Sequence, residues 1–265
     1  MDFRLERYRL IIDTFKKSGY SFFTFADFIK TSPNGRFVIL RHDIDCCPKS
    51  ALRMARIEHE LEVRSTFYFR AARTVLRPEI IKKIAELGHE IGYHYEDLAR
   101  AHGDYDRALD SFKRNLYRLR KFYPISTICM HGSPRSKYDN RMLWKKSDYR
   151  KFGIIGEPYL DVDYSKVLYI TDTGRRWNDE KSNIRDRTEG LRTGPLKSSQ
   201  VIMDWARDGQ LNDAVILNTH PHRWHRNLIS WTYDFVIQSA KNVVKAHVLK
   251  VRWRTSKRHL NDSGG

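Results

Sequence analysis

The sequence predicts an α/β fold, a distorted (β/α)7 barrel formed as a single domain with helical additions at both ends. Seven short apolar runs alternate with helical patterns over most of the chain, which is typical of parallel βα units. The length of 265 residues suits one large domain. Asp or His residues follow five of the runs, and a βα barrel gathers its active site at that end of its strands.

Each expected element has a local signal. The strands are short runs rich in apolar, β-branched or aromatic residues, at 37–40, 65–69, 90–94, 126–130, 152–155, 167–170 and 214–217. The helices show apolar residues at helical spacing or begin with proline, at 48–61, 78–87, 105–122 and 199–207. Seven strands favour a closed or nearly closed barrel over an open sheet. Residues 1–30 are expected to form a helix packed outside it.

Three regions are therefore expected within one domain. They are a helical extension over 1–35, the barrel over 36–229, and a basic helix and tail over 230–265. The tail combines apolar residues such as Trp231 and Phe235 at helical spacing with a run of cations. We expect it to cover the bottom of the barrel with a solvated outer face. Contact with an anionic membrane surface or with nucleic acid are the alternatives.

Composition narrows the class of protein. The net charge of +17 favours an anionic partner, although the cations are dispersed and no nucleic-acid-binding motif is present. Specific nucleic-acid binding is therefore ranked last. Three cysteines, Cys46, Cys47 and Cys129, give no disulfide framework. The N-terminus lacks a signal peptide and no run approaches a membrane span, so we expect a cytoplasmic protein.

The residues that follow the strands suggest metal-assisted hydrolysis. One carboxylate and two imidazoles can hold Zn²⁺ while leaving a position for water. A second carboxylate can accept a proton from that water, and a histidine can protonate the leaving group. Residues two apart on an extended segment face the same way, so Asp43 and Asp45 can share one pocket. The other residues at strand ends are His94, His131, Asp172, His220 and His222.

These residues resemble the motifs of the NodB-type polysaccharide deacetylases, also called carbohydrate esterase family 4. The resemblance is carried by Leu-Arg-His-Asp-Ile-Asp at 40–45, by Gly-His-Glu-Ile-Gly-Tyr-His at 88–94, and by an apolar strand ending in His220. It covers residues 36 to 222. It implies a distorted (β/α)7 barrel, one divalent metal ion with zinc expected first, and removal of an N- or O-acyl group from a sugar.

Carried over by position, the resemblance implies that Asp43 is the general base and Asp45 a metal ligand. His94 would be the second ligand and His220 the general acid. The family places its other ligating histidine four residues after the first, where this chain has Leu98.

Our preferred third ligand is His131, since it ends the strand expected beside that of His94. Carboxylates and thiolates remain as alternatives, from Glu96, Asp97, Cys46 or Cys47.

Substrate contacts are expected from the loops around these residues. The Arg-Pro-Pro-Tyr-like segment of the family is missing, and Arg135 stands near its place. Asp172 falls where the family has an acidic motif, and could instead orient another catalytic group. Arg175 and Trp177 could hold an anionic sugar by charge and stacking. His222 lies two residues after His220 and is the alternative acid.

The function predicted is a cytoplasmic deacylase in surface polysaccharide or lipopolysaccharide biosynthesis. Its substrate would be an anionic sugar, linked to a nucleotide or a lipid, and the protein could act at the inner face of the membrane. Leu98 motivates the alternative, a catalytically inactive deacetylase-fold protein that only binds. A nucleic-acid-binding protein is the third hypothesis.

Overall fold

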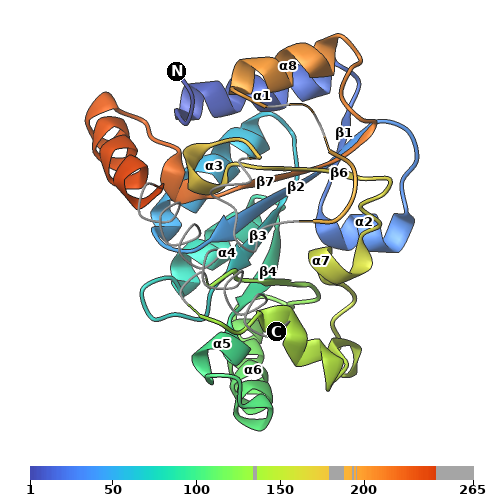
Figure 1. Cartoon of the computed structure of the whole chain (residues 1–265), viewed down its shortest axis with the longest axis vertical. Helices are drawn as coiled ribbons and strands as arrows, with labels where there is room; N and C mark the ends of the chain where they lie inside the picture. The colour runs from blue at the N-terminus through green and yellow to red at the C-terminus, as the bar shows by residue number, and fades with distance from the viewer. Residues whose placement is uncertain (134–135, 179–187, 193, 195, 243–265) are drawn as a thin grey trace, which may run out of the picture.

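A parallel sheet forms the centre of the chain, in a computed structural model that describes residues 1–133, 136–178, 188–192, 194 and 196–242 (Figure 1). Its strands are β1 (Ser21–Phe23), β2 (Phe37–Ile44), β3 (Thr66–Phe69), β4 (Glu90–Tyr95), β5 (Ile128–Met130), β6 (Leu168–Thr171) and β7 (Ala214–Thr219). The order is β5-β4-β3-β2-β7-β6, and β1 also pairs with β2. The sheet curls into a half-barrel surrounded by helices, which confirms the predicted α/β class.

The helices follow the strands as expected. They are α1 (Leu5–Lys17), α2 (Phe25–Thr31), α3 (Pro48–Glu60), α4 (Pro78–Glu86), α5 (Asp97–Arg100), α6 (Tyr105–Arg120), α7 (Pro158–Asp161) and α8 (Ser199–Arg207). Short 3-10 helices are η1 (Asn140–Lys145), η2 (Tyr149–Phe152), η3 (Thr173–Arg175) and η4 (Pro221–Arg223). A further helix spans residues 228–242. In the described part of the chain, no helix is long and apolar enough to cross a membrane.

Two expectations about the sheet are wrong. Residues 152–155 form no strand, because Gly153 takes a left-handed conformation (φ 68°) directly after η2. Only an isolated bridge joins Thr127 to Gly156 there. Residues 1–30 contribute β1 as well as helices, and Ser21 of β1 pairs with Phe37 of β2. The seventh strand therefore comes from the N-terminal segment, where a run of three residues was too short to predict.

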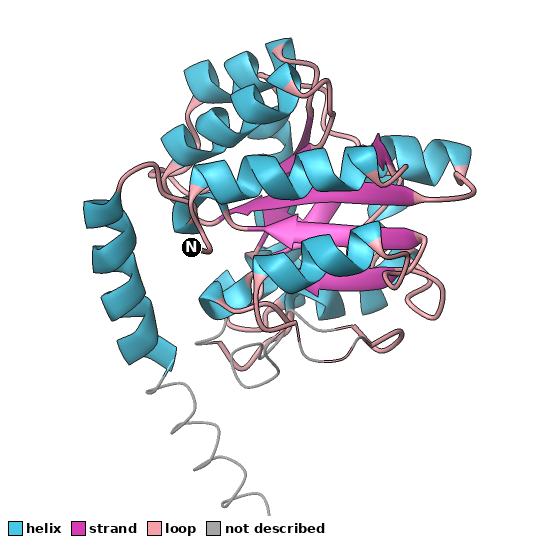
Figure 2. Cartoon of the chain, turned by 90° about the horizontal axis from the view of Figure 1, so that it is seen from above, coloured by secondary structure: helices cyan, strands magenta, loops and turns pink. Residues whose placement is uncertain are grey.

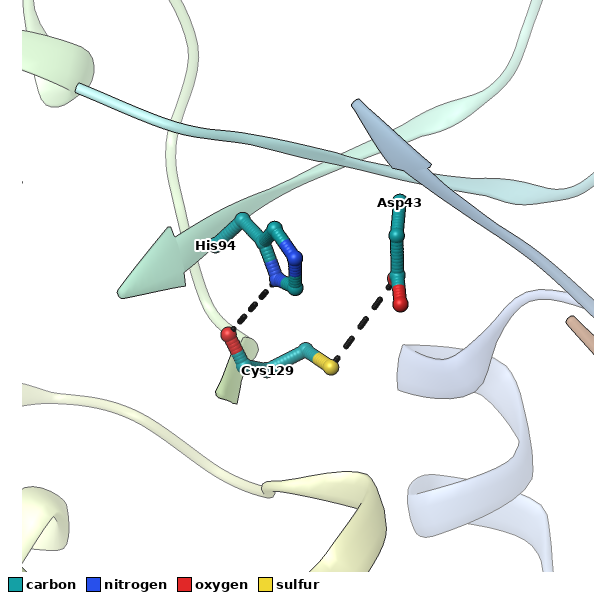
Figure 3. A group of neighbouring side chains, drawn as sticks. All are labelled: Asp43, His94 and Cys129. Carbon is teal, nitrogen blue, oxygen red and sulfur yellow. Dashed lines mark hydrogen bonds between the residues drawn. The ribbon is translucent and has the colours of Figure 1, made fainter. Parts of the chain in front are cut away.

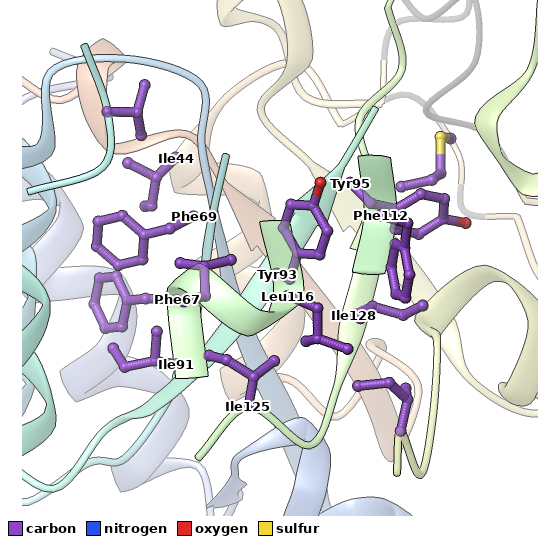
Figure 4. Close-up of a cluster of buried hydrophobic side chains, with 14 of the residues drawn as sticks. Ile44, Phe67, Phe69, Ile91, Tyr93, Tyr95, Phe112, Leu116, Ile125 and Ile128 are labelled. Carbon is purple, nitrogen blue, oxygen red and sulfur yellow. The ribbon is translucent and has the colours of Figure 1, made fainter. Parts of the chain in front are cut away.

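The sheet is covered on both faces, and every residue of β2 is buried. Side chains of a strand alternate between faces, so Val38 joins a core cluster with α1 and α8 while Ile39 joins a cluster on the other face. A third cluster packs α6 against β3 and β4, with Phe112 near Tyr93 (Figure 4). This packing fixes the strands whose ends carry the polar residues.

A buried polar network ties α3 to the sheet through Glu58. Its Oε1 accepts a hydrogen bond from the hydroxyl of Tyr8 (2.6 Å), and Nε2 of His42 lies 3.0 Å from it. Its Oε2 accepts a hydrogen bond from Ser65, whose hydroxyl also contacts His89 at 3.1 Å. Burial raises the pKa of Glu58, but His42 and the other partners outweigh burial and lower it. Two histidines of the motifs are therefore structural, bound to an ionised carboxylate.

The helix of residues 228–242 does not cover the bottom of the barrel. Asp234 lies 3.1 Å from Arg175 and 3.1 Å from His225, which follow β6 and β7. Asn242 donates a hydrogen bond to the carbonyl of Gly174 (2.9 Å). The helix is thus attached at the carboxyl ends of the strands, and it stands clear of the main body at the left of Figure 2.

We predict that Glu58→Gln destabilises the fold. The change removes the charge of a buried acceptor, and hydrogen bonds to charged groups contribute roughly 1.5–3 kcal/mol each, so the free energy of unfolding should fall by about 2 to 4 kcal/mol. Urea denaturation measures it. The matched control is Glu60→Gln on the same helix, because Glu60 pairs with Arg9 at the surface and should change stability by less than about 0.5 kcal/mol. Equal midpoints for both variants would contradict the role assigned to Glu58.

Candidate active site

The carboxyl ends of four strands of one parallel sheet, β2, β4, β5 and β7, bring the predicted catalytic residues together. Asp43 lies on β2, and Asp45 follows one residue after its end. His94 lies near the end of β4, where it pairs in register with Cys129 of β5. His131 comes directly after β5 and His220 directly after β7. Parallel pairing therefore places all of these side chains at one edge of the sheet.

Two imidazoles converge on the carboxylate of Asp45. Nε2 of His94 lies 3.5 Å from its Oδ1, and Nε2 of His131 lies 3.3 Å from the same oxygen. The three ligand atoms lie within 4.8 Å of one another. Asp45 Oδ1 is buried and accepts no hydrogen bond within the described residues. An oxygen and two imidazole nitrogens are a donor set that suits Zn²⁺ or a similar divalent ion.

The other ring nitrogen of each histidine, Nδ1, has a polar partner of its own. Nδ1 of His94 donates to the backbone carbonyl of Cys129 (3.0 Å), which leaves Nε2 as the nitrogen that faces Asp45. Nδ1 of His131 lies 3.3 Å from a carboxylate oxygen of Glu96, which Arg70 holds with hydrogen bonds of 2.8 Å to both oxygens. Carboxylates and carbonyls in this position fix the orientation of metal-binding histidines. The residues present therefore fit a divalent metal ion.

The charges around His131 also favour a cation. Burial lowers the pKa of His131, but Asp45 and Glu96 outweigh burial and raise it to about 9. Burial likewise raises the pKa of Asp45, yet the neighbouring histidines lower it well below its usual value. An ionised carboxylate thus stands among imidazoles that accept positive charge. A metal ion would replace a proton in this arrangement.

Asp43 lies beside this group and has a different set of partners. Its Oδ2 accepts hydrogen bonds from Arg41 (2.9 Å) and Asn218 (3.1 Å). Its Oδ1 is directed toward the thiol of Cys129, 3.9 Å away (Figure 3). Burial raises the pKa of Asp43, but Arg41, His94 and His220 together lower it. Asp43 is therefore an ionised carboxylate with one oxygen anchored.

Sequence reasoning missed Arg41 as the cation paired with Asp43. It considered Arg135, which lies outside the described residues. The available signal was spacing, since residues two apart on a strand share a face. The guanidinium of Arg41 is fully buried and also donates to the hydroxyl of Tyr159 (3.1 Å). The positive charge beside Asp43 thus comes from the same strand.

His220 is oriented by Asp172, which comes directly after β6. Nδ1 of His220 lies 2.6 Å from Oδ1 of Asp172, and Nε2 lies 4.0 Å from Oδ2 of Asp45. Burial and Arg223 lower the pKa of His220, but Asp172 outweighs them and raises it. His220 can therefore carry a proton next to the Asp45 group. Asp172 also accepts a hydrogen bond from the indole of Trp224 (2.8 Å), so both of its oxygens are engaged.

His222 lies close to His220, with ring centres 6.0 Å apart. Burial and the neighbouring Arg223 lower its pKa to about 4, so its ring is neutral at pH 7. Its Nδ1 is buried without a hydrogen bond to the described residues. His222 is thus the weaker candidate for the acid and stands at the site as a neutral group.

Of three residues predicted to contact substrate, Asp172 takes the alternative role of orienting His220, and Trp177 and Arg175 are engaged by other parts of the chain. Asp172 is fully buried and serves to orient His220. The indole of Trp177 is buried, donates to Ser199 (3.2 Å) and stacks on Phe3. Arg175 points its guanidinium toward Trp231, whose carbonyl it contacts at 3.0 Å. These loop residues pack against distant parts of the chain, which the local sequence could not reveal.

None of the alternative ligands considered from the sequence belongs to a group of potential ligands among the described residues. Glu96 contacts the Nδ1 side of His131, and Cys46 belongs to neither group. Leu98 has no ligand atom and packs in a core cluster. Asp97 accepts hydrogen bonds from Tyr93 and Ser111 (both 2.6 Å). Cys47 directly precedes α3 and belongs to no group of potential ligands among the described residues.

The thiol that does approach the site is that of Cys129. It forms a second potential ligand group with Asp43 and His94. His94 belongs to both groups, so it could bind an ion in only one of them at a time.

Comparisons with known proteins give low-identity matches to solved structures of carbohydrate esterase family 4. No family model and no curated protein matches the chain. A CE4 family pseudoenzyme from Bacillus anthracis has 12% identity and a TM-score of 0.44, over 80% of this chain and 62% of its own. A CE4 esterase from Streptococcus mutans has 14% identity and a TM-score of 0.44, over 89% and 90%. A family 4 carbohydrate esterase from Streptomyces lividans in complex with acetate has 14% and 0.42, over 80% and 88%.

Because the identities are only 12% and 14%, the chemistry of this chain has to be inferred from its own residues. The chain spans 62% of the length of the Bacillus anthracis pseudoenzyme.

We predict that His131→Ala weakens Zn²⁺ binding by more than about 100-fold, because loss of an outer-shell partner alone typically costs 10- to 100-fold. Competition with a chromophoric chelator measures the affinity. His222→Ala is the matched control, since His222 lies beside His220 but belongs to neither potential ligand group. Unchanged affinity in His131→Ala would exclude His131 as a ligand.

Proposed function

We propose that this chain is a divalent-metal-dependent hydrolase that removes an N- or O-linked acyl group from a sugar. The observation that carries the proposal is the convergence of His94 and His131 on one oxygen of Asp45, with Asp43 and His220 beside them. Three ligands with an open position, a carboxylate base and a histidine acid are the parts that hydrolysis of an amide or ester needs. The family resemblance of 40–45 and 88–94 supports sugar deacylation.

The residues divide the chemistry between them. A metal ion held by Asp45, His94 and His131 would polarise the acyl carbonyl and acidify the attacking water. Asp43 accepts the proton of that water at Oδ1, while Arg41 and Asn218 hold Oδ2. The charges of Arg41, His94 and His220 keep the carboxylate ionised. The protonated His220 gives its Nε2 proton to the departing nitrogen or oxygen of the sugar. The products are a free carboxylic acid and the deacylated sugar.

Asp172 is a positioning residue in this scheme. It binds Nδ1 of His220, so Nε2 is directed toward Asp45 and the reacting atoms. A carboxylate in this position fixes the tautomer of the histidine and stabilises its charged form.

The substrate we propose is an anionic sugar, carried on a nucleotide or a lipid during surface polysaccharide or lipopolysaccharide assembly in the cytoplasm. The net charge of +17 supports a phosphate-bearing substrate. The alternative, a protein that binds without catalysis, was motivated by Leu98. His131 stands where a third ligand is needed, which supports the enzyme.

We predict that the protein releases acetate or formate from acylated amino sugars only when metal is bound. Colorimetric detection of the free acid, on nucleotide-linked and unlinked sugars, measures it. Treatment with a chelator should abolish release, and Zn²⁺ should restore it. Asp43→Asn should retain stoichiometric metal and lose at least about 100-fold in kcat, as expected for a general base. Full activity of the metal-free protein would contradict the proposal.

We also predict that Asp172→Asn lowers kcat by about 10²- to 10⁴-fold with little change in KM, because the wrong tautomer of His220 would be favoured. The matched control is Asp163→Asn, since Asp163 is an exposed residue that contacts Lys166 at the surface. A change confined to KM would assign Asp172 to substrate binding instead.

A further inference from the structure

The helix of residues 228–242 presents its apolar side to solvent. Ile229, Tyr233, Val236 and Ala240 follow helical spacing and therefore share one side. The first three are 85%, 70% and 59% exposed, and Ala240 is also exposed. An ordinary surface helix would bury such a stripe against the core.

The opposite side of the helix, which faces the protein, carries the partly buried Trp231 together with three polar residues. Asp234, Gln238 and Asn242 lie on it, and Gln238 is buried. Asp234 pairs with Arg175 and His225, and Asn242 bonds to the loop after β6. The polar groups thus have partners within the chain, whereas the apolar stripe has none among the described residues.

The charge that follows this stripe in the sequence indicates the chemistry of its partner. From residue 235 to residue 261 the sequence has no Asp or Glu and seven cations, namely Lys241, Lys245, Lys250, Arg252, Arg254, Lys257 and Arg258. An apolar stripe next to clustered Lys and Arg is the combination that binds anionic lipid surfaces. A second copy of the chain would bring two such cationic segments together, and their repulsion disfavours it.

We propose that the stripe formed by Ile229, Tyr233, Val236 and Ala240 docks on an anionic lipid bilayer. The helix contacts Arg175 and His225, which follow β6 and β7 and lie close in sequence to Asp172 and His220. Docking therefore brings the carboxyl ends of these strands near the lipid surface. The proposal that the helix binds lipid depends on the helix alone. Only the idea that this binding serves a lipid-linked sugar substrate depends on the proposed function.

The test is flotation of the full chain with vesicles of phosphatidylcholine containing phosphatidylglycerol, compared with phosphatidylcholine alone. We expect binding to the anionic vesicles only, and at least a ~10-fold loss of binding in the double variant Ile229→Asp, Val236→Asp. Both residues are exposed, so the fold should tolerate the change. The matched control is Leu10→Asp, an apolar residue on α1 that is 50% exposed and should leave binding unchanged.

Three outcomes would overturn the proposal. The first is equal binding by the double variant and the unchanged chain. The second is loss of binding on Lys250→Gln and Arg252→Gln but not on substitution of the stripe. The third is a dimer in solution that the stripe substitutions dissociate without affecting vesicle binding. Acid release from a water-soluble substrate by the double variant is measured in parallel. Retained release with lost flotation by the double variant supports docking, whereas flotation of the unchanged chain without acid release contradicts only the proposed function.

Discussion

Burial of charge on β2 is the constraint on which the rest of the structure depends. Arg41, His42 and Asp43 are all buried on a central strand, and an unpaired charge there would cost several kcal/mol. Each therefore has a partner of opposite or complementary character. Arg41 and Asp43 pair on one face, and His42 meets Glu58 of α3 on the other. The same pairings hold α3 against the sheet and present one carboxylate at the site.

The group of potential metal ligands differs from the arrangement that the family resemblance implies. The family takes two histidines four residues apart, and this chain has Leu98 at the second position, packed in the core. His131 reaches the site from the neighbouring strand instead, because β4 and β5 pair in parallel with His94 opposite Cys129. Because these groups stand on separate strands, their geometry depends on sheet pairing. Glu96, paired with Arg70, contacts the other nitrogen of His131.

The sequence was sufficient for the elements and for the residues at strand ends, because both depend on local periodicity and on the parallel order of the strands. It was insufficient where a tertiary contact decides. Gly153 ends η2 and prevents a strand, and β1 is too short to show a pattern. Trp177 lies near the site in sequence, but its ring packs on Phe3 from the opposite end of the chain.

The network around Glu58 affects how the loss of activity on replacing each histidine should be interpreted. His42 and His89 stand in the two motifs that most resemble a catalytic centre, yet they contact Glu58 and Ser65 beneath α3. Replacing either one removes a support of the fold, while replacing His94 or His131 removes a donor at the site. Activity alone would rank all four as equally essential. Melting temperature and bound metal, measured on the same preparations, separate the histidines that build the scaffold from those that do the chemistry.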